Sequence, residues 1–263
     1  DTLNKTEHAQ PAILTASIAV LRMLEHETGF KANQLCRFTM GHSLGEYTAL
    51  VAAEALSLAD GVRLVWFRGQ KMQEAAAGLD PAMTALILRK ATVNEIIDEV
   101  SKVQRAIDHE LGQTDAAVRK EVVQVGNVNT STQVTLSGTR RAVDKAIAHL
   151  HSRDLAIRAV SINVSAPFHS DLMAPAARSL KAEFERVMPF YPPTMTVISN
   201  ATARPIGCHK DIGDILATQA VTTCRWLESM EYLKDQGTKR WFCVGPGSVI
   251  ANMVRREYPE MIV

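Results

Sequence analysis

A serine flanked by glycines is the residue of this 263-residue chain best suited to nucleophilic chemistry. It lies in Gly41-His42-Ser43-Leu44-Gly45, after an apolar stretch and before a run of helix-forming residues. A sharp strand-to-helix turn would lift the hydroxyl above a sheet, and such a turn tolerates little more than a hydrogen beside the serine. The N–H of Leu44 would then face an oxyanion formed at Ser43. Because Gly-x-Ser-x-Gly also arises by chance, the motif alone favours an enzyme only weakly.

A serine hydroxyl needs a base within hydrogen-bonding reach, usually a histidine, and the chain has eight. Six lie in polar, mostly helix-end or loop contexts where solvated side chains are expected: His8, His26, His109, His149, His151 and His209. His42 is too close in sequence to reach around to Ser43. His169 follows Ala166-Pro167-Phe168 in a loop, where a side chain could face the serine turn. The residues alone leave two readings of His169 open, a base and an ordinary loop histidine.

A buried arginine is the third candidate. Ser57 is expected to cap a helix that runs to about Ala77, and Arg68 lies in the middle of its apolar stripe. The stripe consists of Val62, Leu64, Val65, Met72, Ala75 and Ala76. The guanidinium should therefore point inward. It could snorkel out or pair with an internal carboxylate, or its planar fork could hold a substrate carboxylate through two parallel hydrogen bonds.

The elements around these residues predict an α/β core. Arg37–Met40 is expected to be a strand immediately before the serine turn, and Glu46–Leu56 a helix packed beneath it, which is the order that a nucleophilic serine turn requires. The other elements expected here are helices at Ala9–His26, Asp171–Val187, Asp211–Val221 and Trp226–Gln236, a last helix after Gly247, and strands at Thr196–Ser199 and Arg240–Val244.

Between Met83 and Val160 the pattern changes. It predicts a strand at Met83–Leu88, a helix at Thr92–Ile107, strands at Val122–Val128 and Gln133–Ser137, a helix at Arg140–Ser152 and a strand at Ala156–Val160. This βαββαβ order is that of a ferredoxin-like unit, and the polar stretch Asp108–Lys120 is expected to be a surface excursion. We therefore predict a discontinuous α/β-hydrolase-like core at 1–81 and 161–263, interrupted by a ferredoxin-like small subdomain at 82–160.

Composition narrows the class of protein. The hydrophobic fraction is 46%, and 29 Lys and Arg oppose 28 Asp and Glu, so nothing points to nucleic acid or an anionic membrane as a partner. The cysteines Cys36, Cys208, Cys224 and Cys243 lack metal-ligand spacing, and we expect reduced, mostly buried thiols and no metal. No apolar stretch approaches the length that a bilayer requires, and the first residues resemble no export signal.

Taken together, the motifs resemble the malonyl-CoA:acyl carrier protein transacylases, nearly from end to end. The motifs that carry the resemblance are Gly41-His42-Ser43-Leu44-Gly45-Glu46, Arg68, Ala166-Pro167-Phe168-His169, Gln10-Pro11-Ala12, Asn127-Val128-Asn129, Gln219 before Trp226, and Val244-Gly245-Pro246-Gly247. The resemblance implies a malonyl group carried on Ser43, and it implies that no cofactor is needed beyond malonyl-CoA and a holo acyl carrier protein.

The resemblance also implies roles for single residues. His169 would be the base, the backbone carbonyl of Gln219 would orient its imidazole, and Leu44 N–H would stabilise the oxyanion. Arg68 would bind the malonyl carboxylate. The remaining substrate-binding residues implied are Gln10, His42, Phe168, Asn129 and Arg158, with Phe168 favouring malonyl over methylmalonyl.

One feature of the family is not found in this sequence. The family begins with a strand and a Gly-Gln-Gly loop that supplies a second oxyanion donor, and no such segment precedes Asp1. From this we expect either a longer natural chain or a piece that lacks one donor. The loss of one donor typically costs about 10²- to 10³-fold in rate.

The predicted function is transfer of malonyl from malonyl-CoA to the phosphopantetheine thiol of an acyl carrier protein, in fatty acid biosynthesis. Alternatives are an acyltransferase module of a larger fatty acid or polyketide synthase, a serine esterase, and a catalytically idle scaffold. A serine esterase would require an acidic residue between serine and histidine and a histidine late in the chain. We expect a monomer. The polar stretch Asp108–Lys120 favours a location in the mitochondrial matrix, and the alternative is the bacterial cytoplasm.

Overall fold

The computed structural model describes residue 3 and residues 5–112, 121–187 and 190–263, and it contains both helices and strands, so the chain has an α/β fold. These residues form two compact units. The first comprises Asp1–Gln70, Leu180–Leu216 and Glu228–Val263, and the second Lys71–Ser179 and Ala217–Leu227. The second unit contains the segment 82–160, for which a small subdomain is expected, and extends beyond it on both sides.

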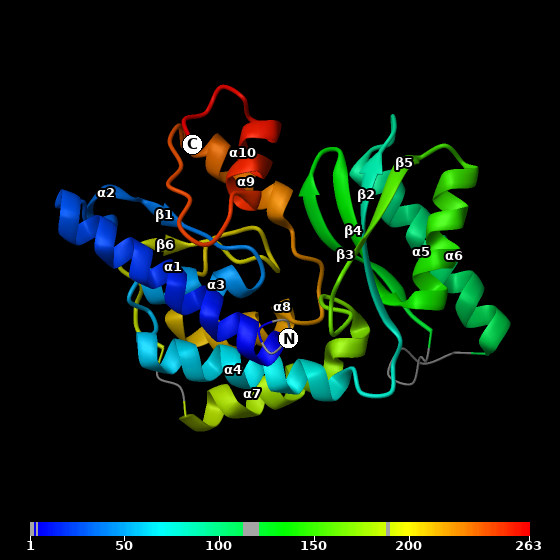
Figure 1. Ribbon diagram of the computed structural model, residues 1–263, viewed down its shortest axis with the longest axis horizontal. Helices are drawn as coiled ribbons and strands as arrows, with labels where there is room; N and C mark the ends of the chain where they lie inside the picture. The colour runs from blue at the N-terminus through cyan, green and yellow to red at the C-terminus, as the bar shows by residue number, and fades with distance from the viewer. Residues whose placement is uncertain (1–2, 4, 113–120, 188–189) are drawn as a thin grey trace. The chain divides into compact units, whose positions relative to one another are not determined.

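The elements follow one another along the chain as labelled in Figure 1. The helices are α1 (Thr6–Thr28), α2 (Ala32–Leu35), α3 (Leu44–Ala52), α4 (Leu58–Ala75), α5 (Val93–Leu111), α6 (Arg140–Ser152), α7 (Ala174–Val187), α8 (Ile212–Gln219), α9 (Trp226–Asp235) and α10 (Val249–Glu257). The strands are β1 (Phe38–Thr39), β2 (Pro81–Leu88), β3 (Val123–Thr130), β4 (Gln133–Thr139), β5 (Ala156–Ile162) and β6 (Thr196–Val197). Short 3₁₀ turns at Asp171–Met173 and His209–Asp211 precede α7 and α8.

The first unit contains a short two-stranded parallel sheet and several helices. β1 pairs in parallel with β6, with Phe38 opposite Thr196. α1 packs against α3, and the side chains of Leu14 and Leu50 are fully buried there. Ser57 caps α4 as expected, because its Oγ accepts a hydrogen bond of 3.0 Å from the N–H of Asp60.

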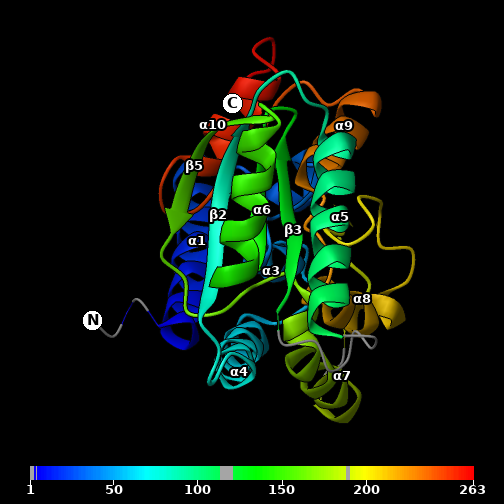
Figure 2. The ribbon, with the colours of Figure 1, turned by 90° about the vertical axis from the view of Figure 1, so that its right-hand side faces the viewer.

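The second unit contains a four-stranded antiparallel sheet in the order β3-β4-β2-β5. Its elements occur as strand, helix, strand, strand, helix, strand, which is the order that the sequence predicts. Figures 1 and 2 show α5 and α6 on one face of this sheet. The apolar residues Ile96 and Val100 of α5, and Val143 and Leu150 of α6, are buried, as their helical spacing requires.

A buried carboxylate joins α5 to α6. Glu99 on α5 is only 3% exposed and contacts a lysine, a histidine and an arginine. Its carboxylate lies 2.6 Å from Lys102 Nζ, 2.6 Å from His149 Nε2 and 2.9 Å from Arg153 Nη1. Lys102, followed by His149, lowers the pKa of Glu99 to about 2. The expectation of a solvated His149 is therefore wrong, because this side chain is half-buried against Glu99.

The Glu99 contacts make stability depend on pH. Because the pKa of Glu99 is lower in the folded protein than its ordinary value of 4.5, its stabilisation is present above pH 4.5 and is lost as the pH falls towards 2. Glu99→Gln should therefore lower Tm at pH 7, and its difference from the wild type should narrow at pH 3. Thermal unfolding at the two pH values measures this. Glu110→Gln, which removes an exposed ion pair with Lys145, is the matched control and should change Tm little. An equal effect of the two substitutions would contradict the prediction.

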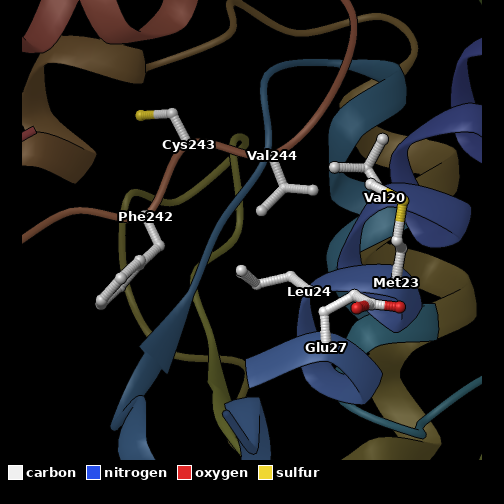
Figure 3. Close-up of a pocket in the computed structure, with 7 residues that line it drawn as sticks. All are labelled: Val20, Met23, Leu24, Glu27, Phe242, Cys243 and Val244. Atoms are coloured by element: carbon white, nitrogen blue, oxygen red, sulfur yellow. The ribbon is translucent and has the colours of Figure 1, made fainter. Parts of the chain in front are cut away.

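The strand expected at Arg240–Val244 is wrong. Only an isolated bridge between Arg240 and Ile262 forms, supported by a hydrogen bond of 2.8 Å from Trp241 N–H to the carbonyl of Ile262. A ladder needs a neighbouring strand, and among the described residues none pairs with 242–244. Phe242 is accordingly 60% exposed. Figure 3 shows this segment beside α1, with an apolar hollow between them. The hollow is lined by Val20, Met23, Leu24, Glu27, Phe242, Cys243 and Val244.

Three further expectations need correction. The surface excursion expected at Asp108–Lys120 does not begin at Asp108, because α5 continues to Leu111. Residues 113–120 of this stretch lie outside the described residues. The helix expected to reach Val221 ends at Gln219. The four cysteines form no disulfide, but only Cys224 is buried, and Cys243 is exposed, so the expectation of mostly buried thiols is wrong. None of the helices in the described ranges combines the length and apolar character needed to cross a lipid bilayer.

Candidate active site

The backbone of Ser43 adopts a conformation that L-residues rarely use. Its φ is 53° and its ψ is −106°, between the end of β1 and the first residue of α3. Such a conformation costs on the order of 1–3 kcal/mol and persists only where the surroundings enforce it. Ser43 is the N-cap residue of α3, yet its side chain makes no capping hydrogen bond. The hydroxyl is therefore not used to satisfy the helix, as an N-cap serine ordinarily is.

The two glycines of the motif differ in what surrounds them. A Cβ on Gly41 would lie 2.0 Å from the carbonyl oxygen of Gly45, which no real contact permits. A Cβ on Gly45 would meet nothing within 4 Å. The expectation that both positions exclude a side chain is therefore correct for Gly41 and wrong for Gly45, where the turn leaves open space.

Substitution of the two glycines should separate these cases. Gly41→Ala should lower Tm by several degrees, because a backbone shift of the serine turn is unavoidable. Gly45→Ala, its matched control, lies inside α3 and should leave Tm unchanged or raise it, since alanine favours a helix by up to about 1 kcal/mol over glycine. Thermal unfolding of both variants is the measurement. Equal losses of Tm would show that the contact at Gly41 does not govern the turn.

Asn200 contacts the serine turn from a position far along the chain. Its Oδ1 accepts a hydrogen bond of 2.6 Å from Ser43 N–H, and its Nδ2 donates one of 2.8 Å to the carbonyl of Gly41. The backbone N–H of Asn200 donates in turn to Oε2 of Glu46, at 3.0 Å. Asn200 and Glu46 are both fully buried. Sequence reasoning missed Asn200, because a single Asn with no motif around it carries no signal.

Arg68 lies beside the serine hydroxyl. As predicted, it points inward, and it is only 2% exposed. Its Nη2 donates to Ser43 Oγ at 3.2 Å, and its Nη1 donates to Oε1 of Gln10 at 2.7 Å. Gln10 is itself fixed within α1, since its Nε2 donates to Thr6 Oγ1 at 2.7 Å. The structure thus brings together three residues that the sequence predicts to share a site: Ser43, Arg68 and Gln10.

Tyr47 forms an aromatic wall next to the guanidinium. The centre of its ring lies 5.5 Å from Arg68 Cζ, which is within the range of a cation–π contact. Burial raises the pKa of Tyr47 to about 12, and the nearby positive charge of Arg68 partly opposes this rise. Tyr47 therefore remains a neutral phenol at physiological pH, and its ring presents a negative face to the cation.

His169 lies in the second unit, in a loop that fixes its ring. It is 2% exposed and has a φ of 58°. Its Nδ1 lies 2.9 Å from the carbonyl oxygen of Gln219 and 3.1 Å from that of Thr222. Both partners are acceptors, so Nδ1 must carry the hydrogen, and Nε2 of the neutral ring is then a proton acceptor. The Gln219 contact follows the resemblance, whereas Thr222 was missed.

The helix end at Gln219 explains why its carbonyl is available. α8 stops at Gln219, and the last carbonyls of a helix have no partner within it. The C-terminal end of a helix also carries partial negative charge, which stabilises a positive imidazolium by about 0.3–1 kcal/mol and by more where the geometry is partly buried. The unexpectedly early end of α8 therefore creates the acceptor that His169 uses.

β3 holds both the His169 loop and the segment that follows α8. Gln124 accepts from Asp171 N–H at 2.6 Å, and a Cβ on Gly126 would lie 3.2 Å from the carbonyl oxygen of Phe168. On its other side, the carbonyl of Gly126 accepts from Cys224 N–H at 2.8 Å. One strand thus contacts both the His169 loop and the segment that follows the Gln219 and Thr222 carbonyls.

The other predicted site residues lie as follows. Leu44 begins α3, and its N–H donates to no described residue, so it is available to an oxyanion. His42 is a half-buried sequence neighbour of Ser43, and Phe168 is a half-buried sequence neighbour of His169.

The last two predicted residues lie on strands of the second unit. Asn129 is buried on β3, and its Nδ2 lies 3.5 Å from Thr135 Oγ1. Arg158 is exposed on β5, at the opposite edge of the sheet from β3, so the structure does not place it with the His169 loop.

Each unit carries groups of the kind that acyl transfer through a serine ester uses. The first unit presents a hydroxyl, a buried cation and a helix N-terminal N–H, and the second presents an imidazole whose Nδ1 faces two backbone carbonyls. Over the described ranges, no group of three or more His, Cys, Asp or Glu side chains is arranged to hold a metal ion.

Comparison with known proteins agrees with this chemistry. The family model described as the acyl transferase domain matches residues 1–256. The chain is 36% identical over 257 residues to the malonyl CoA-acyl carrier protein transacylase of Escherichia coli (strain K12), covering 97% of this chain and 76% of that protein. The chain therefore belongs to the acyl transferase domain family, and within it to the malonyl CoA-acyl carrier protein transacylases.

Solved structures give the same result. The malonyl-CoA:acyl carrier protein transacylase of Xanthomonas oryzae superposes with a TM-score of 0.86 at 33% identity, covering 99% of this chain and 76% of that chain. A malonyl-transacylase in complex with a type II polyketide synthase acyl-carrier protein superposes with a TM-score of 0.86 at 31% identity, covering 98% and 76%. These identities are high enough that the likeness extends beyond the fold to the family.

Proposed function

We propose that this chain transfers a malonyl group from malonyl-CoA to the phosphopantetheine thiol of an acyl carrier protein, through a malonyl ester on Ser43. The observation that carries the proposal is the buried Arg68, whose Nη2 lies 3.2 Å from Ser43 Oγ. A guanidinium so close to the acylated oxygen meets the carboxylate of a short acyl chain such as malonyl. A planar fork of donors suits a carboxylate through two parallel hydrogen bonds.

The first half-reaction makes the ester. Ser43 Oγ attacks the thioester carbonyl, and its proton passes to Nε2 of His169. The tetrahedral intermediate carries its negative charge on the former carbonyl oxygen, which accepts a hydrogen bond from Leu44 N–H. Collapse of the intermediate breaks the C–S bond, and the coenzyme A sulfur leaves with the proton from His169. The imidazolium that exists in between is stabilised by the carbonyls of Gln219 and Thr222.

The second half-reaction is the reverse with a different thiol. The phosphopantetheine thiol gives its proton to His169 and attacks the malonyl ester, and Ser43 Oγ leaves with that proton. A thiolate is a better leaving group than an amine, so an imidazole oriented by neutral carbonyls is sufficient where amide hydrolysis uses a carboxylate. Arg68 holds the acyl chain in place while the thiol approaches, which favours transfer over hydrolysis.

Removal of the cation should change acyl selectivity. Arg68→Ala should reduce malonyl transfer by about 10- to 100-fold, the value of a charge-assisted hydrogen bond, and acetyl transfer by only a few-fold. The kcat/KM values for malonyl-CoA and acetyl-CoA with the same carrier protein measure this. Arg68→Lys keeps the charge but loses the fork, and it should fall between the wild type and Arg68→Ala. Equal losses of kcat/KM for malonyl-CoA and acetyl-CoA would contradict the proposed contact between Arg68 and the malonyl carboxylate.

Removal of the imidazole should slow acylation itself. His169→Ala should lower the single-turnover rate of adduct formation by about 10²- to 10⁴-fold, as expected for a general base. His151→Ala, an exposed histidine at the end of α6, is the matched control and should acylate at the wild-type rate. The adduct is followed by intact mass after rapid mixing with malonyl-CoA, and Ser43→Ala should form none. Wild-type acylation by His169→Ala would remove it from the mechanism.

The same mass experiment tests the alternative of a serine esterase. A malonyl adduct that persists in water and is discharged by a thiol supports transfer. Rapid hydrolysis without a thiol supports an esterase. An esterase ordinarily orients its histidine with a carboxylate, whereas Nδ1 of His169 lies 2.9 and 3.1 Å from the backbone carbonyl oxygens of Gln219 and Thr222. A module of a larger synthase would perform the same chemistry. The rates of malonyl transfer to a separate acyl carrier protein and to the carrier domain of a synthase distinguish a stand-alone transacylase from such a module.

The remaining features are proposals of the same kind. We infer an α/β-hydrolase-like first unit and a ferredoxin-like second unit, supported by the β1–β6 parallel pair and by the β3-β4-β2-β5 order. An acyl carrier protein as partner is supported by the transacylase complex described above. No cofactor beyond the two thioesters is required, and a monomer remains our expectation. The bacterial relative favours a bacterial cytoplasm over the mitochondrial matrix, for which neither structure nor comparisons offer support.

A further inference from the structure

We infer that Asn200 is the positioning residue of the serine turn, and that with Glu46 it frees the Ser43 hydroxyl from capping α3. The inference rests on the proposed role of Ser43 as the acyl acceptor. The side-chain amide of Asn200 bonds to backbone atoms of Ser43 and Gly41, so we assign it the role of holding the nucleophile rather than reacting.

The hydrogen bonds of Asn200 span the turn from both sides. Its Oδ1 accepts a hydrogen bond of 2.6 Å from the N–H of Ser43, and its Nδ2 donates one of 2.8 Å to the carbonyl oxygen of Gly41. A single planar amide therefore fixes the residues before and after His42 relative to each other. Because the Asn200 side chain is fully buried, leaving either of its polar atoms without a hydrogen bond would be costly.

Glu46 occupies the position at which a helix ordinarily completes a capping box. It is the third residue of α3, and in a capping box its carboxylate would accept the N–H of the N-cap residue while the N-cap hydroxyl accepts the N–H of the third. Here the N–H of Ser43 is taken by Asn200 instead, and the carboxylate of Glu46 accepts the N–H of Asn200 at 3.0 Å. The other hydrogen bond of a capping box, in which Ser43 Oγ would accept the N–H of Glu46, is not made. Asn200 thus takes the place of Ser43 in the cap, and the Ser43 hydroxyl accepts a hydrogen bond from Arg68 Nη2 instead.

Loss of Asn200 should let the turn relax towards an ordinary N-cap. Asn200→Ala removes both side-chain bonds, so Ser43 can rotate to cap α3 with its own Oγ. We expect malonyl adduct formation to slow by about 10- to 100-fold, because a displacement of about 1 Å at a nucleophile has an effect of this size. Asn200→Asp keeps an acceptor for Ser43 N–H but loses the donor to Gly41, and it should slow acylation to an intermediate degree.

A double-mutant cycle distinguishes positioning from mere support of the fold. In the wild-type background, Ser43→Ala removes the hydrogen bond from Arg68 Nη2 but no helix cap, so the loss of Tm should be only that of the Arg68 contact. In the Asn200→Ala background, the same change should lower Tm by about 2–4 °C more, the added effect of losing a helix cap. Ser199→Ala is the matched control in the same loop. It removes the hydrogen bond of 3.1 Å from Ala201 N–H and should acylate at the wild-type rate.

The measurements are the single-turnover rate of the malonyl adduct, the rate of Ser43 labelling by a small organophosphonate, and Tm for each variant of the full chain. Slowed acylation and labelling with a non-additive Tm cycle support the inference. Wild-type rates for Asn200→Ala, slowing equal to that of Ser199→Ala, or an additive cycle would overturn it. If the wild-type protein forms no malonyl adduct, the proposed function fails, while the labelling rates and the cycle still decide the role of Asn200.

Discussion

The backbone strain at Ser43 is the constraint on which the first unit depends. A non-glycine residue with a φ of 53° needs surroundings that exclude the ordinary alternatives. Gly41 provides one part, because its missing Cβ lets the chain pass the carbonyl of Gly45. Asn200 provides another, and the parallel pairing of β1 with β6 explains how it arrives, since Asn200 follows β6 as the serine turn follows β1. The short sheet therefore delivers the nucleophile and its support from two adjacent strand ends.

In the second unit, strand β3 holds a residue with an unusual backbone conformation. His169 also has a positive φ, 58°, and its loop is held against β3 by Gln124 and Gly126. The edge of β3 that does not pair with β4 binds the segment at Cys224, which follows the end of α8. The His169 loop and the segment that follows Gln219 and Thr222 are thus both held against β3. This arrangement fixes the tautomer before any substrate binds.

Local patterns made much of this predictable from the sequence. Helical spacing placed Arg68 on the buried stripe of α4, and the bounds of α6 follow from its period and its flanking residues. Contacts between distant segments were not predictable, because no local pattern specifies them. Asn200 reaches Ser43 across 157 positions of sequence, and the carbonyl of Thr222 reaches Nδ1 of His169 across 53. The strand expected at Arg240–Val244 failed for the same reason, since a β pattern does not reveal whether a neighbour pairs with it.

The burial of Arg68 links the stability of the first unit to the selectivity that we propose. Removing a guanidinium from water is costly, and the cost is reduced where its donors are satisfied. Gln10 and Ser43 each accept one of its hydrogen bonds, and the ring of Tyr47 offers a negative face. These contacts hold the cation at a fixed distance from the hydroxyl without neutralising its charge. A neutral acyl chain placed there would displace polar contacts and return none. A terminal carboxylate would return two charge-assisted hydrogen bonds, so selection for an acidic acyl group follows from the burial of the charge itself.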